Sequence, residues 1–254
     1  MKKTKTMVVG FPLYDGVTLM DFCGATDVFA FPRSAEAAFI PIWLAAEKKP
    51  VITSEGTYVY PNYSFTEKHP QIDLLFVPGG TVAGVTGIMF NETYQSFIKK
   101  TATTATWVGS VCVGAFILAA AGLLKKCSAT TYWSQVPNLA LLKKKFNLKI
   151  PRGNPRGIVD KKRKIFTGGG ISSSIDLALM LLEAIKGKAY AQSSQLYMQY
   201  APRPPVHAGD PEQAPKKLVK KILQEQAGYT AAYYAAVQKI LQQKTPAGKI
   251  VNRK

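Results

Sequence analysis

The chain has 254 residues, of which 47% are hydrophobic and 19% are charged, which suits one large domain, or one domain with an extension, around a substantial core. Its 33 basic and 15 acidic residues give a formal net charge of +18, which would attract polyanions without specificity. No helix-turn-helix, zinc-finger or RNA-binding aromatic motif accompanies this charge, so we expect a solvated basic surface and no specific nucleic-acid partner.

The cysteine and histidine content argues against a metal centre and a disulfide framework. The three cysteines (Cys23, Cys112 and Cys127) and the two histidines lack metal-ligand spacing. We therefore expect free thiols, a reducing compartment and a cytoplasmic protein. The apolar stretch after the basic start is too short for a signal peptide, and no stretch approaches the roughly 20 apolar residues of a membrane span. We expect no membrane association.

The first half of the chain alternates predicted strands and helices. Short apolar runs bounded by turn residues predict buried strands, and apolar residues at helical spacing predict helices. This pattern predicts a strand over 5–11, a helix after Asp15-Gly16, a strand over 39–46, a hairpin over 51–60, a strand from Ile72 that ends in Pro78-Gly79-Gly80, and a helix over 91–103.

The stretch 105–124 begins as an apolar strand and ends as an Ala/Leu-rich helix, with Cys112 at the junction. Small residues beside Cys112, among them Gly114 and Ala115, suit a sharp strand-to-helix turn. At such a turn the helix amides favour the thiolate, so Cys112 is a candidate nucleophile. The alternative is a small core residue, because free cysteine is often buried. The local pattern leaves both interpretations open.

The second half continues the alternation and then changes character. The pattern predicts an extended piece over 127–133, an amphipathic helix over 136–146, a hairpin over 158–166, a helix over 177–185 and a helix over 189–200. The proline run 202–205 marks a boundary. We therefore divide the chain into an α/β domain, 1–209, and a basic helical extension, 210–254. The extension has helical apolar spacing up to 243, a possible break at Gly228 and a tail expected to be mobile, 244–254.

The alternation predicts a doubly wound, mostly parallel sheet. Ligands in such folds bind beyond the carboxyl ends of the strands, where glycines allow a close approach of backbone amides. The loops that carry Asp21, Gly79-Gly80 and Cys112 all follow predicted strands. We therefore expect these residues to be neighbours, which favours the nucleophile interpretation of Cys112. Asp21 lies among apolar residues, which would raise the pKa of its carboxyl unless it has a partner.

Several motifs in one order resemble a known family. They are Leu19-Met20-Asp21-Phe22-Cys23-Gly24, Phe76-Val77-Pro78-Gly79-Gly80, Val111-Cys112-Val113-Gly114-Ala115, Ala129-Thr130-Thr131-Tyr132-Trp133, Thr167-Gly168-Gly169-Gly170 and Gln199-Tyr200-Ala201-Pro202-Arg203-Pro204-Pro205. Over about residues 5–209 the chain resembles the ThiJ/PfpI superfamily, and within it the isonitrile hydratase (cyclohexyl-isocyanide hydratase) branch. The resemblance implies a flavodoxin-like fold similar to class I glutamine amidotransferases, and a homodimer.

The resemblance also implies a chemistry. Cys112 would be the nucleophile, Asp21 its acid/base partner, and Gly79, Gly80 and Val113 an oxyanion pocket. The implied reaction hydrates a small isonitrile to an N-substituted formamide through a thioimidate on Cys112, without metal or organic cofactor.

Two positions differ from the branch pattern. Val113 stands where the branch has threonine, and Tyr132 stands where it has histidine; we place Tyr132 in the substrate site. His69 and His207 lie in predicted loops and are expected at the surface. The differences keep two alternatives open: a non-catalytic ligand- or redox-sensing module, as in AraC-type regulators, and glyoxalase-like activity on small dicarbonyls.

Overall fold

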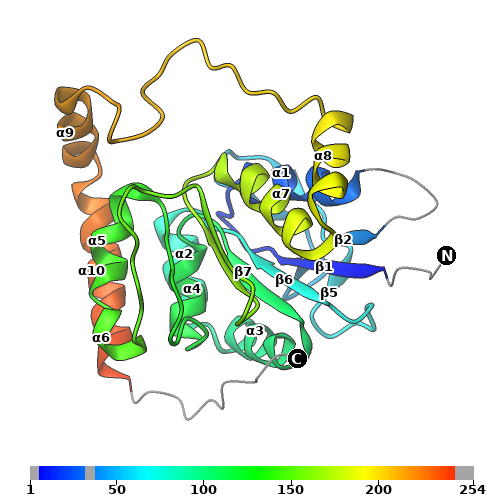
Figure 1. Cartoon of the computed structure of the whole chain (residues 1–254). Helices are drawn as coiled ribbons and strands as arrows, with labels where there is room; N and C mark the ends of the chain where they lie inside the picture. The colour runs from blue at the N-terminus through cyan, green and yellow to red at the C-terminus, as the bar shows by residue number, and fades with distance from the viewer. Residues whose placement is uncertain (1–5, 32–37, 244–254) are drawn as a thin grey trace.

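The computed structural model describes residues 6–31 and 38–243, and its centre is a twisted seven-stranded sheet (Figure 1). The strand order is β5-β2-β1-β6-β7-β9-β8, and every neighbouring pair is parallel except β8 and β9. The strands are β1 (Met7–Pro12), β2 (Phe39–Ala45), β5 (Tyr63–Ser64), β6 (Leu74–Val77), β7 (Trp107–Ser110), β8 (Gly157–Asp160) and β9 (Ile165–Gly168). A separate hairpin pairs β3 (Val51–Ile52) with β4 (Tyr58–Val59). The doubly wound, mostly parallel sheet expected from the sequence is confirmed.

Helices cover both faces of the sheet (Figure 1). One layer holds α1 (Leu19–Ala30), α7 (Ser173–Lys186) and α8 (Lys188–Tyr197). The other holds α2 (Val82–Phe90), α3 (Glu92–Thr104), α4 (Gly114–Ala120), the 3-10 turn η1 (Trp133–Gln135), α5 (Val136–Ala140) and α6 (Lys143–Phe146). The strands between the layers are short and almost wholly apolar, as parallel strands buried on both faces must be.

The register of the sheet brings three loops to one edge. Val77 at the end of β6 pairs with Ser110 at the end of β7, and β1 pairs in parallel with β6. The loops after β1, β6 and β7 therefore leave the sheet on the same side. These loops lead to Asp21, Gly79 and Cys112, the residues expected to be neighbours.

The prediction of one continuous helix over 136–146 is wrong. The amphipathic segment 136–146 breaks at Leu141 and Leu142 into α5 and α6, rather than forming one helix. At the break the N–H groups of Leu141 and Leu142 donate to carbonyls three residues back (Asn138, 3.3 Å, and Leu139, 3.1 Å), a tighter turn than that of an α-helix. Leu139, Leu142 and Phe146 are all buried, so the apolar periodicity is satisfied without continuity.

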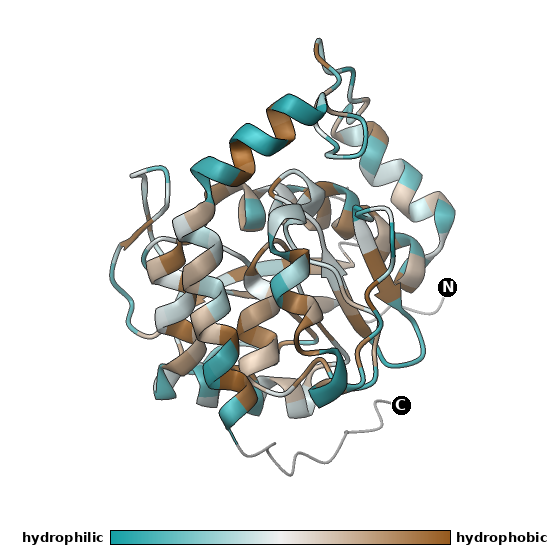
Figure 2. Ribbon diagram, turned by 90° about the vertical axis from the view of Figure 1, so that its left-hand side faces the viewer, coloured by the Kyte–Doolittle hydropathy of each residue, from teal (hydrophilic) through white to brown (hydrophobic). Residues whose placement is uncertain are grey.

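The C-terminal segment forms two helices that differ in burial. They are α9 (Lys216–Glu225) and α10 (Ala227–Gln242), and the break between them falls at Gln226, close to the expected Gly228. Helix α10 packs on α2, α4, α5 and η1 and buries Tyr233, Ala236, Val237 and Ile240. Helix α9 buries no side chain, and Figure 2 shows its alternating hydrophilic and hydrophobic bands. The expected tail, 244–254, lies outside the described residues.

Candidate active site

Cys112 sits at the turn between β7 and α4 in a backbone conformation that side chains rarely adopt. Its φ is +53°, in the left-handed region. Hydrogen bonds hold both of its peptide groups: its N–H donates to the carbonyl of Gly169 (2.7 Å), and its carbonyl accepts from Oγ1 of Thr131 (2.8 Å). A non-glycine residue persists in this region only where its surroundings enforce it, and such strain gathers at functional sites.

The thiol of Cys112 is buried, with only 5% of the residue exposed. Burial raises its pKa well above the ordinary value, and the charge of nearby Asp21 raises the pKa further. A backbone hydrogen bond from Val113 acts in the opposite direction. The amide after the cysteine is therefore the group that stabilises a negative charge at this sulfur.

Asp21 lies in the first turn of α1 and is fully buried. Its Oδ2 accepts a hydrogen bond from the N–H of Gly79 (2.7 Å), while its Oδ1 is buried and has no hydrogen-bond partner among the described residues. Burial raises its pKa to about 8, the Gly79 bond lowers it, and the charge of Glu55 raises it. The carboxyl therefore retains a proton at neutral pH, and Oδ1 is the oxygen left free to donate it.

Gly79 is the point at which the three loops meet. A Cβ at Gly79 would lie 2.9 Å from Oδ2 of Asp21 and 2.9 Å from the backbone N of Val113. Only glycine leaves room for the carboxyl and the amide on either side of this loop. Gly114 serves the same purpose at the start of α4, where a Cβ would lie 2.5 Å from the carbonyl oxygen of Val77.

The three amides expected to bind an oxyanion have different surroundings. The Val113 amide faces the thiol, and the Gly79 amide is bonded to Asp21. Gly80 forms an isolated bridge with Val17, and a Cβ there would lie 2.4 Å from the carbonyl oxygen of Gly16. Gly80 therefore packs against the loop after β1.

Tyr132 lies next to the nucleophile turn. It follows Thr131, which holds the Cys112 carbonyl, and a Cβ on Gly170 would approach its ring to 3.1 Å. Its hydroxyl accepts a hydrogen bond from Nε2 of Gln226 (3.0 Å), at the start of α10. This contact joins the C-terminal segment to the site.

Three tyrosines near the site escaped prediction from the sequence. Tyr14 donates a hydrogen bond to the carbonyl of Pro78 (3.0 Å) and so supports the Gly79 loop. Tyr229 and Tyr233 reach the site from α10, and the charge of Cys112 affects the pKa of all three phenols. The four-residue spacing of Tyr229 and Tyr233 indicated one helix face, but nothing in the sequence indicated what that face covers.

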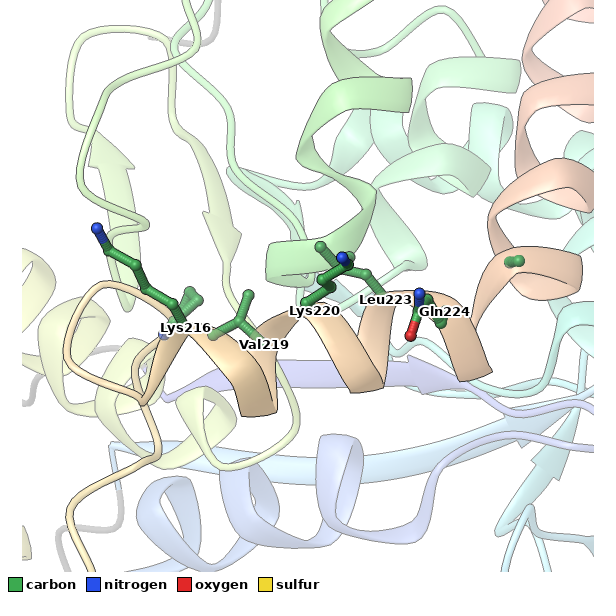
Figure 3. A pocket seen from close by; sticks show the side chains of 7 residues that line it. Lys216, Val219, Lys220, Leu223 and Gln224 are labelled. Atoms are coloured by element: carbon green, nitrogen blue, oxygen red, sulfur yellow. The ribbon is translucent and has the colours of Figure 1, made fainter.

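A separate groove lies along one side of α9. Figure 3 shows Lys216, Val219, Lys220, Leu223 and Gln224 projecting from that side of the helix. Its lining includes none of the predicted site residues. The groove is therefore distinct from the enclosed centre at Cys112.

The described residues contain no group of three His, Cys, Asp or Glu side chains arranged to hold a metal ion. Within the same part of the chain, every helix is too short or too polar to cross a bilayer. The chemistry available at the site is that of one thiol, one carboxyl, backbone amides and phenols.

Comparisons with known proteins find similar sequences and a similar fold. The profile of the DJ-1/PfpI family matches residues 7–184. Isonitrile hydratase from Pseudomonas putida is 36% identical over 214 residues, which cover 83% of this chain and 86% of that protein. The HTH-type transcriptional regulator GbdR of Pseudomonas aeruginosa is 25% identical over 182 residues, which cover 71% of this chain but 47% of the regulator.

A solved structure of a ThiJ/PfpI family protein from Pseudomonas syringae superposes with a TM-score of 0.82 at 28% identity and covers 92% of both chains. This similarity confirms the flavodoxin-like fold class. Because the coverage is 92%, the superposition includes part of the segment after Gly209.

Proposed function

The chain belongs to the DJ-1/PfpI family, and we propose on that basis that it is a cysteine-dependent enzyme that adds water to a small neutral electrophile, with isonitriles as the candidate substrates. Cys112 acts as the nucleophile and Asp21 as its acid/base partner. The similarity to an isonitrile hydratase over most of both chains supports the substrate class.

One observation carries this proposal: a buried cysteine at positive φ lies beside a carboxyl whose Oδ1 has no partner. A residue that serves only to fill the core gains nothing from a strained turn or from a buried, unpaired oxygen, both of which cost free energy. A nucleophile and a proton donor use both features.

The reactive form of the pair carries one proton, with Cys112 as thiolate and Asp21 as acid. The sulfur attacks the terminal carbon of the isonitrile, a C–S bond forms, and Asp21 protonates that carbon to give a thioimidate, R–N=CH–S. Asp21, now a carboxylate, accepts a proton from water as its oxygen adds to the same carbon. Asp21 passes this proton to the nitrogen and then takes the proton of the added hydroxyl as the C=O bond forms and the C–S bond breaks. The formamide R–NH–CHO leaves, and the Cys112 thiolate and the protonated Asp21 are both restored.

The test is a substrate panel run on wild type and on Cys112→Ala. The panel contains cyclohexyl isocyanide and methylglyoxal, and the product is identified by mass spectrometry. We expect wild type to form the formamide and Cys112→Ala to lose turnover by at least about a thousandfold, because the covalent path is removed. Undiminished isonitrile hydration by Cys112→Ala would reject the role of this thiol.

A sensing module is the second candidate, and two observations favour it. Val113 has no hydroxyl to assist the chemistry beside the nucleophile, and the regulator GbdR is similar to this chain over 182 residues. Under this alternative Cys112 would be oxidised to a sulfinate, or would bind a ligand, without turnover. Formation of a sulfinate in peroxide, together with no turnover of any panel member, would favour sensing; formation of a lactate product from methylglyoxal would favour glyoxalase-like activity.

A further inference from the structure

Helix α10 places a chain of aromatic rings over the nucleophile turn. Tyr233 stacks on Phe116, four residues after Cys112, with ring centroids 4.9 Å apart and 30° between the planes. Tyr229 meets Tyr233 edge-on at 5.0 Å and Tyr132 edge-on at 6.4 Å. The C-terminal helix therefore contacts the first turn of α4, which follows the cysteine, and Tyr132, which follows the Thr131 that binds the Cys112 carbonyl.

Two buried polar atoms in this cluster have no partner. The hydroxyl of Tyr233 is buried, with the whole residue at 0% exposure, and has no hydrogen-bond partner among the described residues. Its phenol nevertheless lies close enough to that of Tyr229 for each to affect the pKa of the other. Oε1 of Gln226 is also buried without a partner. Buried polar groups without partners are rare in native proteins and call for a ligand, a water or a change on binding.

The phenols remain protonated beside the thiol. Burial raises the pKa of Tyr229 and of Tyr233, and the charge of Cys112 raises both further. A protonated phenol is a hydrogen-bond donor. Tyr229 is the middle ring of the chain, between Tyr132, which follows the residue that binds the Cys112 carbonyl, and Tyr233, which stacks on Phe116. It therefore lies between the two segments that contact the cysteine turn, and the charge of Cys112 affects its pKa.

We propose that Tyr229 donates a hydrogen bond to Cys112 and to the small molecule bonded to it, and that Tyr233 is a positioning residue that donates to the hydroxyl of Tyr229. The inference rests on the proposed cysteine chemistry and names the substrate more closely. The substrate has an apolar body that packs on the rings of Tyr132 and Tyr229, and one acceptor atom next to the electrophilic carbon.

The relay accounts for the unpartnered hydroxyl of Tyr233. When Tyr229 turns its hydrogen towards the ligand, its oxygen becomes free to accept a hydrogen bond from Tyr233. In the isonitrile case the acceptor atom is the nitrogen of the thioimidate, and a donor to this nitrogen makes the carbon more electrophilic towards water. Tyr229 therefore assists the second half of the reaction, after the C–S bond has formed.

Polar contacts fix the start of α10 in the position that this role needs. Nε2 of Gln135 donates to Oγ1 of Thr230 (3.1 Å), and Nδ2 of Asn138 donates to the carbonyl of Thr230 (2.9 Å). Thr230 is the next residue after Tyr229. The backbone next to Tyr229 is thus bound to η1 and α5, which follow the loop whose Thr131 holds the Cys112 carbonyl.

The experiment compares Tyr229→Phe, Tyr233→Phe, the double variant and Tyr234→Phe. Tyr234 is the matched control, since it lies on the same helix but is 51% exposed. The first readout is the pH dependence of Cys112 alkylation by iodoacetamide, followed by mass spectrometry of the Cys112 peptide so that Cys23 and Cys127 do not interfere. The second is kcat and KM for cyclohexyl isocyanide, and the third is the melting temperature.

Removing the phenol of Tyr229 is expected to raise the apparent pKa of the Cys112 thiol and to lower kcat about tenfold or more, because a hydrogen bond to a charged group is lost. Tyr233→Phe should act in the same direction with a smaller effect. Because the second phenol acts through the first, the double variant should be no worse than Tyr229→Phe alone. Tyr234→Phe should match wild type.

An alkylation profile of folded Tyr229→Phe identical to that of wild type overturns the donor role. Additive losses in the double variant overturn the relay. The alkylation profile needs no substrate, so it separates this inference from the proposed function: a wild type that hydrates no isonitrile rejects the substrate class, while the Tyr229 effect on the thiol still stands or fails by itself.

Discussion

Asp21 combines full burial with a hydrogen bond to only one of its two oxygens. Its pKa of about 8 lies well above the ordinary value of 3.8 for an aspartate, because burial disfavours the charged form. Between about pH 4 and pH 8 the folded protein therefore keeps a proton that the unfolded chain has lost. The reactive form of the Cys112–Asp21 pair carries a negative charge in a buried site. Its formation therefore lowers the folding stability.

The sign of the resulting pH dependence is opposite to that of an ordinary salt-bridged aspartate. Between about pH 4 and pH 8 the folded state binds more protons than the unfolded state, so the free energy of unfolding falls as pH rises. Over the same range kcat/KM should rise, because the pair loses its first proton. We expect Asp21→Asn to remove both trends and to unfold at a higher urea concentration than wild type at pH 8.

Urea unfolding at pH 5 and pH 8 measures the first trend, and kcat/KM over the same range measures the second. Asp27→Asn is the matched control, since Asp27 lies on the same helix and is exposed. A wild type whose unfolding free energy is the same at both pH values, or an Asp27→Asn variant that also loses the trend, would contradict the assignment to Asp21.

Gly79 has no room for a side chain between the Asp21 carboxyl and the Val113 amide. In Gly79→Ala the added Cβ would lie 2.9 Å from Oδ2 of Asp21 and from the amide of Val113, closer than Cβ contacts normally are. The loop must move away from one of them, so we expect kcat to fall at least about tenfold, as small misplacements of reacting groups cost that much or more. Steady-state kinetics and the melting temperature measure the effect.

Gly87→Ala is the control for this prediction. Gly87 lies inside α2 with no atom within 4 Å of an added Cβ, and alanine is favoured over glycine in a helix by about 1 kcal/mol. This variant should keep wild-type kinetics and melt at a higher temperature. If Gly79→Ala had the same kinetics as wild type, the loop would have room for a methyl group, and the prediction would be wrong.

At the scale of elements, the strands other than the two-residue β5 could be predicted, because buried strands are short apolar runs. Helix α2 could not, because its sequence contains two glycines and has no amphipathic pattern. It forms where Thr81 caps it, with Oγ1 accepting from the N–H of Gly84 (3.2 Å), and where Val85, Ile88 and Met89 become buried. The apolar residues of this stretch do not recur at helical spacing, so the sequence did not indicate a helix.

The turn at Cys112 could be predicted from the sequence, but the contacts around it could not. Small residues around one cysteine between a strand and a helix predicted the turn, and the confirmed parallel sheet brings Asp21 and Gly79 to the same edge. The unpartnered Oδ1 of Asp21 and the shared space around Gly79 could not be predicted, because each depends on where three loops far apart in the sequence meet. Their roles in catalysis stay predictions.

The same reason explains why α10 was not recognised as part of the site. Its helical spacing was visible, but its partners are Phe116, Gln135 and Asn138, about a hundred residues earlier in the chain. Contacts over such separations are fixed by the packing of the whole fold. Neither the homodimer nor the cytoplasmic location is tested by this packing, and both stay predictions.

For the whole molecule, the decisive question is whether residues 1–209 form a unit without the C-terminal helices. Helix α10 contributes four buried side chains and satisfies the amides of Gln135 and Asn138. A chain ending at Gly209 would expose the ring of Phe116 and leave these amides in water. We expect it to melt at a lower temperature and to alkylate at Cys112 faster than the full chain, since the cover over the turn is gone.

A chain ending at Gln243 is the control, because it keeps α10 and lacks only residues outside the described part of the structure. It should melt and react like the full chain. If the chain ending at Gly209 instead keeps the melting temperature and the alkylation rate of the full chain, then 1–209 is an independent domain and α10 is dispensable for the site. If only the chain ending at Gly209 melts at a lower temperature and alkylates faster, the functional boundary lies after α10. The burial of Tyr233 and its neighbours indicates the same boundary.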